Sequence, residues 1–382
     1  MIKLSLFSLL ALLLPAQEPP RPSNPNTTLK SPEVLSDKRI VFRLYAPKAQ
    51  EVAIGGDWVS QGRGTAGKLE KDDQGIWSIT VGPLVPDFYT YNFTVDGVRV
   101  LDPKNVDIKP GVTSLSNMFE IPGDPENYEA TRPVPHGIIS IVSYESKALG
   151  VTRSMRVYTP PGYEGSSTRY PVFYLLHGSG DDDAGWSTVG RAGFILDNLI
   201  AAGKAKPMIV VMPNGSMPRG QGNPQELFAD EFLHSVMPCV ESHFRVASGR
   251  ENRALAGLSM GGGQTLRVGP VNLDKFAYLG VFSSGIREGS DTEKNLAAFL
   301  SNPTESNKML KLFWIGVGEK DTTAGAGAHK LIEVLKAHGI TYEFHESEGA
   351  HTWINWRHYL NDFAPLLFRE AATSPSSGSG SR

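Results

Sequence analysis

The chain has 382 residues, enough for two domains of ordinary size with a substantial buried core. Hydrophobic residues make up 40% and charged residues 20%, which excludes a disordered or fibrous protein. With 37 Lys and Arg against 40 Asp and Glu, the net charge is −3. No basic surplus points to nucleic acid or to an anionic membrane surface, so we expect an uncharged substrate.

The first residues form a charged start and a short apolar run that ends at Pro15. This pattern is typical of a secretory signal peptide, here residues 1–17, because the run is too short to cross a membrane as a stable helix. A retained N-terminal anchor is the alternative. No later segment approaches the length of a transmembrane helix, so we expect a secreted or periplasmic protein.

Cys239 is the only cysteine, so we expect no internal disulfide. It lies in an apolar stretch with helical spacing, which predicts a buried structural thiol rather than a reactive one. The sequence has no cysteine pair and no His-x-x-x-His pattern, and its nine histidines are scattered. We therefore expect neither a metal site nor a cofactor.

Residues 18–32 are rich in proline and polar residues and are predicted to form a linker. Up to residue 122, short segments of alternating hydrophobic and polar residues follow, separated by turn formers such as Asp96-Gly97. Strands without a helical period predict a small all-β sandwich over residues 33–122. The clearest strands are expected at residues 39–45, 51–54, 76–81, 89–95 and 98–100.

Three segments of this predicted sandwich resemble a known family of modules: Phe42–Pro47, Gly55–Trp58 and Tyr91–Gly97. They are similar to the immunoglobulin-like carbohydrate-binding modules of glycogen-branching enzymes, which also precede some bacterial feruloyl esterases. The resemblance implies that Trp58 and Trp77 could stack on sugar rings. The alternative, which we favour, is that both tryptophans pack inside the sandwich.

A second proline-marked segment, residues 123–136, is the predicted boundary between two domains. Over residues 137–370 strands alternate with helices, which predicts an α/β domain with a largely parallel sheet covered on both faces. Strands are expected at residues 137–142, 152–158, 170–176, 208–213, 254–256, 276–283, 311–318 and 341–345, and helices at 194–202, 226–244, 328–338 and 356–368. The Ser/Gly-rich residues 371–382 are predicted to be a disordered tail.

The segment from Gly257 to Gly261 has the Gly-x-Ser-x-Gly pattern of a nucleophile elbow, with Ser259 at its centre. A serine that rises above the carboxyl end of a sheet needs a sharp turn from strand to helix, and glycines on either side remove the collisions in that turn. The helix that follows directs its free N–H groups toward the place where an oxyanion would form. This pattern alone is weak evidence for a catalytic serine. The interpretation therefore depends on whether the chain also supplies a base and an acid for Ser259.

A serine hydroxyl needs a base, and the base needs a carboxylate to fix its tautomer. In an α/β-hydrolase fold the acid and then the histidine follow the serine in the chain. His351 lies in a loop just after a predicted strand and is the predicted base, whereas the other candidates lie in helices or at a strand end. Those candidates are His329, His338, His345 and His358.

Asp321 lies in the loop after the strand that ends near Val317, which is the expected place for the acid. Glu346 and Glu348 are the next candidates. Glu319 and Asp274 are interpreted as solvated charges.

The oxyanion hole is predicted to use the backbone N–H of Met260 and that of a residue in the loop after an early strand. In that loop Ser179 is the preferred donor and Gly178 the alternative. His177 is interpreted as structural. The acidic run Asp181–Asp183 is interpreted as a solvated loop rather than a metal cluster, because adjacent acids point in different directions.

Several motifs together resemble the esterase-D-like family of esterases, which includes carbohydrate esterase family one. They are Tyr174–Gly178, Gly185-Trp186, Met212–Gly215, Gly257–Gly262 and Gly349–Trp353. The family contains feruloyl, acetylxylan and enterobactin esterases and mycolyltransferases. Carried over residue by residue, the resemblance implies Ser259 as nucleophile, Asp321 as acid and His351 as base, on an α/β-hydrolase fold.

The sequence thus predicts a secreted serine esterase of plant cell-wall polysaccharide that releases ferulate or a related hydroxycinnamate. Trp186 and Trp353 are candidates to stack on the aromatic acyl group, with packing under the loops as the alternative. Acetylxylan and enterobactin-type ester hydrolysis stay open, as does a non-catalytic glycan-binding protein. The substrate partner is a feruloylated or acetylated polysaccharide, and the sequence leaves the oligomeric state open.

Overall fold

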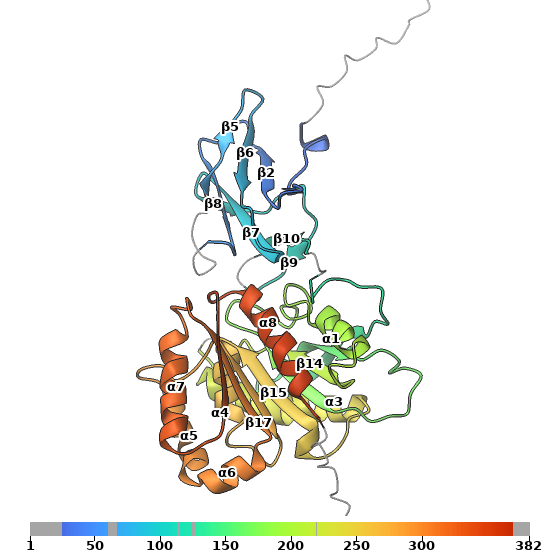
Figure 1. The fold of residues 1–382 in the computed structure, drawn as a ribbon, viewed down its shortest axis with the longest axis vertical. Helices are drawn as coiled ribbons and strands as arrows, with labels where there is room; N and C mark the ends of the chain where they lie inside the picture. Colours follow the sequence, from blue (N-terminus) through green and yellow to red (C-terminus); the bar gives the residue numbers. More distant parts are fainter. Residues whose placement is uncertain (1–24, 60–66, 113–114, 124–126, 219, 370–382) are drawn as a thin grey trace, which may run out of the picture.

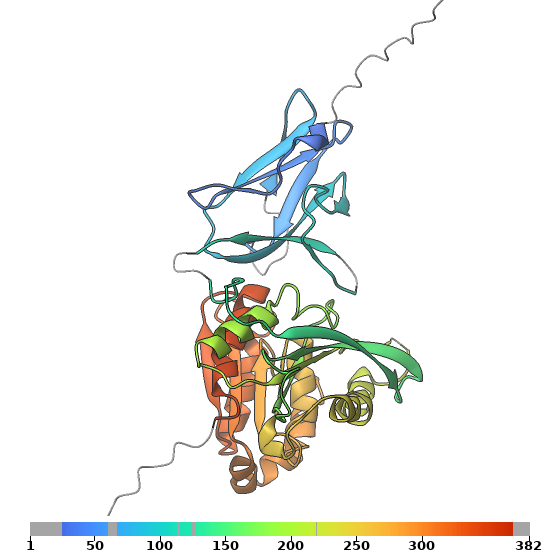
Figure 2. The ribbon, with the colours of Figure 1, turned by 90° about the vertical axis from the view of Figure 1, so that its right-hand side faces the viewer.

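The computed structural model describes residues 25–59, 67–112, 115–123, 127–218 and 220–369. The predicted signal peptide and the predicted tail lie outside these residues. The described chain forms an all-β body followed by a larger α/β body, and the two lie against each other (Figures 1 and 2). The last strand of the first body ends at Ile121 and the first strand of the second begins at Ile138.

The all-β body is a sandwich of two sheets in which every pairing is antiparallel. One sheet has the order β1-β2-β6-β5, formed by Glu33–Val34, Ile40–Tyr45, Ile76–Val81 and Glu70–Lys71. The other has the order β4-β3-β7-β10-β9, formed by Gly67–Lys68, Val52–Gly56, Asp87–Val95, Ser116–Ile121 and Ile108–Lys109. A short strand β8 (Val98–Val100) pairs with β7 across the Asp96-Gly97 turn, as the turn signal predicted.

The two tryptophans of the sandwich face its interior. Trp77 is 7% exposed, and its indole N–H donates to the carbonyl oxygen of Ala46 at 2.9 Å. Trp58 stacks on Phe42 with ring centroids 5.5 Å apart and packs against the apolar core. The packing interpretation is therefore confirmed for Trp77, and Trp58 is half-buried against the same core.

The α/β body is built on an eight-stranded sheet of order β11-β12-β14-β13-β15-β16-β17-β18. The pairs β11–β12 and β12–β14 are antiparallel and the rest of the sheet is parallel. In that order the strands are Ile138–Ser146, Val151–Thr159, Ile209–Pro213, Val172–Leu176, Arg253–Leu258, Tyr278–Phe282, Leu312–Gly318 and Glu343–Ser347. This architecture confirms the predicted α/β-hydrolase fold behind an all-β module.

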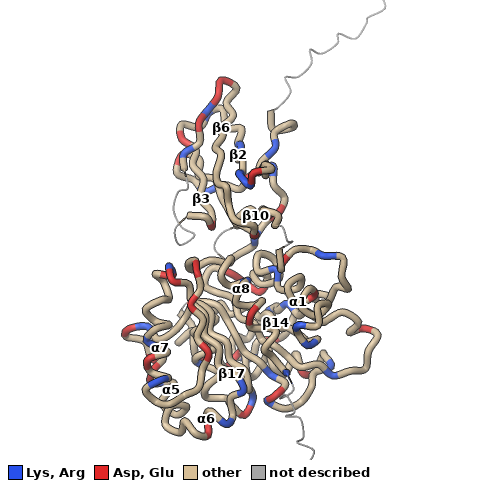
Figure 3. The backbone as a smooth tube through the Cα atoms, in the orientation of Figure 1, with Lys and Arg blue, Asp and Glu red and all other residues tan. Residues whose placement is uncertain are grey.

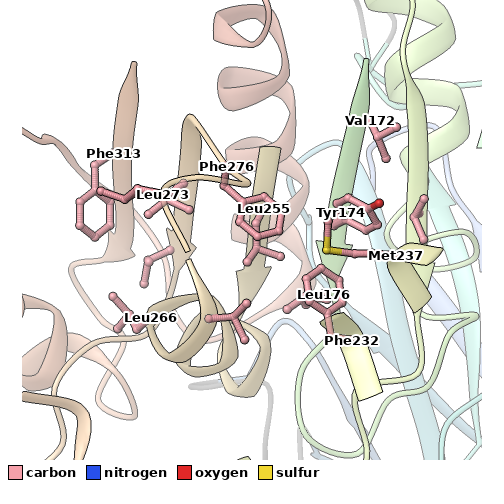
Figure 4. Close-up of a cluster of buried hydrophobic side chains, with 14 of the residues drawn as sticks. Val172, Tyr174, Leu176, Phe232, Met237, Leu255, Leu266, Leu273, Phe276 and Phe313 are labelled. Atoms are coloured by element: carbon pink, nitrogen blue, oxygen red, sulfur yellow. The ribbon is translucent and has the colours of Figure 1, made fainter. Parts of the chain in front are cut away.

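Helices cover both faces of this sheet, and alternate residues of the central strands point to opposite faces. On one face Phe173 and Leu175 pack under α1 (Ala192–Ala201) and α8 (Trp353–Phe363). On the other face Tyr174 and Leu176 join a second cluster, seen in Figure 4 beside Phe232. The helices of that face are α2 (Pro224–Glu231), α3 (Met237–His243), α4 (Met260–Val268), α5 (Thr292–Ser301), α6 (Pro303–Met309) and α7 (Gly325–Ala337).

The helix expected at residues 226–244 is interrupted. Between α2 and α3 the segment Phe232–Val236 is π-helical. Pro238 lies at the start of α3 and cannot donate a hydrogen bond to the carbonyl four residues earlier, which explains why the turn widens there. Cys239 follows directly and is half-buried, so the prediction of a buried thiol was wrong.

A buried ion pair joins the two bodies. Arg357 of α8 is fully buried, and its guanidinium donates to the Asp87 carboxylate of β7 at 2.5 and 3.1 Å. The same group donates to the backbone oxygens of Phe88 at 2.6 Å and Val189 at 2.7 Å. Since all these acceptors are satisfied by one side chain, Arg357 fixes α8 to the sandwich.

We predict that Arg357→Met destabilises the protein by about 3–5 kcal/mol, because it leaves the Asp87 carboxylate buried without its cation. Urea denaturation followed by tryptophan fluorescence measures this. The control is Arg39→Met, since the Arg39–Asp37 pair is exposed to solvent and its loss should change stability little. Equal effects of the two substitutions would contradict the anchoring role.

Glu129 lies buried beside the same joint, and neither of its carboxylate oxygens has a hydrogen-bond partner among the described residues. Burial, and then the negative charge of Asp87, raise the pKa of Glu129 to about 7. The folded protein therefore holds a proton on Glu129 that the unfolded chain releases above its ordinary pKa of about 4.3.

Stability contributed by this proton is present at low pH and is lost as the pH rises toward 7. We predict that Glu129→Gln removes this loss, so the variant gains up to about 3 kcal/mol relative to wild type between pH 5 and pH 8. Denaturation at both pH values measures the difference. Glu70→Gln, at an exposed position on β5, is the control and should show no such gain.

Candidate active site

Ser259 stands on a sharp turn between β15 and α4. Its backbone angles are φ 50° and ψ −110°, a strained conformation for a residue with a side chain. Its N–H donates to the carbonyl oxygen of Phe282 at 2.8 Å, which ties the turn to the neighbouring strand β16. A Cβ atom at Gly257 would lie 2.5 Å from the backbone of Gly261, so the turn requires glycine there.

The structure brings the predicted serine, histidine and aspartate into one hydrogen-bonded chain. His351 Nε2 lies 2.9 Å from Ser259 Oγ, and His351 Nδ1 lies 2.8 Å from Asp321 Oδ2. With its proton on Nδ1, the imidazole donates to the carboxylate and presents a lone pair to the serine hydroxyl. This is the arrangement in which a histidine can accept a serine proton.

The Asp321 carboxylate is held in place from its other side. Its Oδ1 accepts the backbone N–H groups of Thr323 at 3.0 Å and Ala324 at 2.8 Å. Burial acts to raise the pKa of Asp321, but the hydrogen bond and the charge of His351 outweigh it, so this pKa lies below the ordinary value. Asp321 is therefore ionised at neutral pH.

The competing residues lie elsewhere. His329 faces Glu346 at 3.1 Å, and His345 stacks on Trp314. The Nδ1–H of His338 donates to the carbonyl oxygen of Val334 at 2.9 Å, in the helix that His338 follows. His358 lies beside Asp87 at the joint with the sandwich. The acidic candidates Asp274, Glu319, Glu346 and Glu348 are all exposed.

The predicted oxyanion donors flank Ser259. Met260 is the first residue of α4, where N–H groups have no acceptor within the helix. Ser179 and Met260 line one cavity of about 410 Å³ together with Ser259. Gly178 packs against the elbow, since a Cβ there would lie 2.5 Å from Leu258 and 3.4 Å from the Cβ of Ser259. The donor roles remain a prediction.

His177 has the structural contacts that were expected. Its Nε2 accepts the N–H of Gly215 at 2.9 Å, and its Nδ1 lies 2.8 Å from the carbonyl oxygen of Gly178. Burial lowers the pKa of His177, so the ring is neutral and links two loops.

The acidic run Asp181–Asp183 is not the solvated loop that the sequence suggested. Asp181 is 5% exposed and forms an ion pair with Lys109 of the sandwich strand β9. Asp183 accepts from Ser154 at 3.2 Å and lies 3.9 Å from Arg156. The prediction was wrong because the cations come from other parts of the chain, Lys109 from 72 residues away.

A cleft of about 620 Å³ opens at Ser259 and His351, between the two bodies. Trp353 and Trp356 line it, and the ring of Trp356 meets that of His351 edge-on at 5.1 Å. Trp186, predicted as a stacking residue, is fully buried; its N–H donates to Leu176 and its ring packs edge-on against Trp353. Trp186 therefore supports Trp353 and does not face the cleft.

With this geometry established, comparison with known families identifies the larger body. The model of the family described as "Putative esterase" matches residues 146–367. The chain belongs to this esterase family. A second model, "Carbohydrate-binding module 48 (Isoamylase N-terminal domain)", matches residues 30–110 of the sandwich. Both resemblances seen in the sequence are thereby confirmed.

Among curated proteins, this esterase is 34% identical over 352 residues to an "Endo-1,4-beta-xylanase/feruloyl esterase" of Xylanibacter ruminicola. The match covers 88% of this chain and 46% of the relative. It is also 28% identical over 271 residues to the esterase Rv1288 of Mycobacterium tuberculosis, covering 59% of this chain and 56% of the relative. The chain spans about half the length of the curated relatives it matches.

Among solved structures, a family-one ferulic acid esterase from Anaeromyces mucronatus, in complex with ferulic acid, is 25% identical with a TM-score of 0.56. The match covers 63% of this chain and 94% of that one. The enterobactin esterase of Shigella flexneri covers more, 86% of this chain and 92% of its own, with a TM-score of 0.63. Its identity of 15% shows a shared fold only.

Sequence reasoning missed part of the cleft. Trp356 lies three residues after Trp353 on α8, so helical spacing could have placed both rings on one face. Arg287, which lines both cavities that Ser259 lines, follows strand β16. The sandwich residues Asp57, Arg99 and Lys109 also line the cleft. No local sequence pattern predicts that they reach the site on the other domain.

Charges of both signs are interspersed over the two bodies of the esterase (Figure 3). Within the described residues, no three His, Cys, Asp or Glu side chains are grouped to hold a metal ion. None of the described helices has the length and apolar character needed to span a membrane.

We predict that Asp321→Asn lowers kcat for an aryl acetate by roughly 10³–10⁴-fold with little change in KM, because the imidazole loses the partner that fixes its tautomer. Steady-state kinetics measure this. Asp274→Asn is the matched control, since Asp274 is exposed and pairs with Lys275. A loss below about tenfold in Asp321→Asn would remove Asp321 from the triad.

Proposed function

We propose that this esterase is an exported serine carboxylic-ester hydrolase that releases ferulate or a related hydroxycinnamate from plant cell-wall polysaccharide. The observation that carries the proposal is the hydrogen-bonded chain from Ser259 through His351 to Asp321, which lies in a cleft bordered by Trp353 and Trp356. Export rests on the pattern of residues 1–17.

In the first half of the reaction, Ser259 Oγ attacks the ester carbonyl while His351 Nε2 takes the hydroxyl proton. The ionised Asp321 stabilises the imidazolium that forms. The N–H groups of Met260 and Ser179 stabilise the negative charge that develops on the carbonyl oxygen. When the tetrahedral intermediate collapses, the C–O bond breaks and His351 gives its proton to the departing sugar hydroxyl.

In the second half, water attacks the acyl-enzyme and His351 acts again as the base. The intermediate collapses, the proton returns to Ser259 Oγ, and the carboxylic acid is released. The short contacts of 2.9 and 2.8 Å in the resting enzyme support this relay, since no rearrangement is needed to begin it.

Two features favour an aromatic acyl group on a polysaccharide. Trp353 and Trp356 border the cleft beside His351, where their small exposed parts, 5% and 7% of each residue, can contact a hydroxycinnamate ring. Two of the relatives named above, from Xylanibacter ruminicola and Anaeromyces mucronatus, are feruloyl or ferulic acid esterases by name, and the sandwich matches a carbohydrate-binding module. The net charge of −3 argues against a strongly anionic substrate of the enterobactin type.

We predict that the wild type hydrolyses methyl ferulate and an aryl acetate and that Ser259→Ala lowers both rates by about 10³-fold or more. Release of ferulate, followed by chromatography, measures the first reaction. Ser301→Ala, at the exposed end of α5, is the control and should behave as wild type.

Each other outcome points to a different function. Turnover of the acetate alone would retain the triad and move the substrate to acetylated xylan or another small ester. Turnover of neither ester by a folded protein would favour a non-catalytic glycan-binding role.

A further inference from the structure

The loop from Gly178 to Asp181 touches the sandwich on its outer side. Lys109 Nζ pairs with Asp181 Oδ1, and both side chains are largely buried, 15% and 8% exposed. Three residues after Lys109, the N–H of Val112 donates to the carbonyl oxygen of Gly180 at 3.0 Å. One short segment of the sandwich therefore holds two consecutive residues of this loop.

On its inner side the same loop faces the reacting serine. Gly178 and Ser179 line the cleft with Ser259, and Gly178 packs closely against Leu258 of the elbow strand. Gly180 has φ +89°, so the chain turns sharply between the two sides. The N–H of Asp181 donates back to the carbonyl oxygen of Gly178 at 3.3 Å, which links the outer anchor to the inner edge.

The ion pair is the stronger of the two anchors. A buried carboxylate that loses its cation is costly, so Asp181 and Lys109 hold each other firmly. Lys109 also lies in the cleft near Asp57, whose carboxylate already accepts from the backbone and hydroxyl of Thr90 at 2.7 and 2.9 Å. Among the described residues, the Asp181 carboxylate accepts from Lys109 and from no backbone N–H, and Lys109 is its ion-pair partner.

We infer that Lys109 is a positioning residue for catalysis: through Asp181 it holds the loop whose N–H at Ser179 stabilises the oxyanion. This inference rests on the proposed function. An oxyanion donor acts only when it is held within about 0.5 Å of its productive position, and removing a donor costs about 10²–10³-fold in kcat. The sandwich is thereby a structural part of the active site for every ester, including esters that carry no sugar.

The test uses methyl ferulate and an aryl acetate, because these esters carry no glycan that a binding module would recognise. In the full-length Lys109→Met variant, kcat should fall by about tenfold or more while KM changes by less than about threefold. Lys109→Arg restores the ion pair and should recover most of the rate. The control is Lys68→Met, whose partner Glu51 lies on the same sandwich in an exposed pair.

A second variant guards against misfolding. Lys109→Met with Asp181→Asn removes both charges, so no carboxylate is left buried without a cation. Its kcat should be as low as that of Lys109→Met alone, because either change releases the loop. Binding of an aryl boronic acid, which forms a tetrahedral adduct with an active serine, should weaken in parallel with kcat, while inhibition by ferulate should not change.

Wild-type kcat for both small esters in the folded double variant would overturn the inference, whatever happens to activity on xylan. A loss confined to the polymer would likewise overturn it, because that result assigns Lys109 to glycan binding alone. If the wild type hydrolyses neither ester, the proposed function is contradicted. The inference is then contradicted too, but by the wild type rather than by the behaviour of the Lys109 variants.

Discussion

The strained turn at Ser259 is the constraint on which the rest of the site depends. A side chain at φ 50° is held there by glycines that let β15 and α4 approach closely and by the hydrogen bond to Phe282. That geometry places the hydroxyl above the carboxyl edge of the sheet, where the loops after β13, β17 and β18 meet. His351 and Asp321 reach Ser259 because both follow strands that end at this edge.

The sandwich is attached to the same edge and at two separate places. Arg357 fixes α8, the helix that begins two residues after His351, and Lys109 holds the loop that carries Ser179. The proposed base and the proposed oxyanion donor thus each lie next to an anchor on the module. In a protein with this arrangement, a binding module and a catalytic domain are not independent units, and their relative position bears on the chemistry.

The fold was largely predictable from sequence because its strands are continuous apolar runs and its turns carry strong signals. The triad was predictable for a related reason: Ser259, Asp321 and His351 each follow a strand in the order that the fold requires. What sequence could not supply were contacts between distant segments. Asp181 was misread as solvated because Lys109 lies on another domain. For Trp186 the sequence left stacking on substrate and packing under the loops open, because burial depends on how α8 packs. The π-helical turn before Pro238 was missed because the helical period continues through it.

The central claim is that Ser259 is an activated nucleophile, and covalent labelling tests it most directly. The full-length protein would be treated with a fluorophosphonate, digested, and analysed by mass spectrometry. A single adduct on Ser259, suppressed by prior addition of methyl ferulate, is the result expected. An adduct on another residue, or a folded protein that takes up no label, would contradict the account.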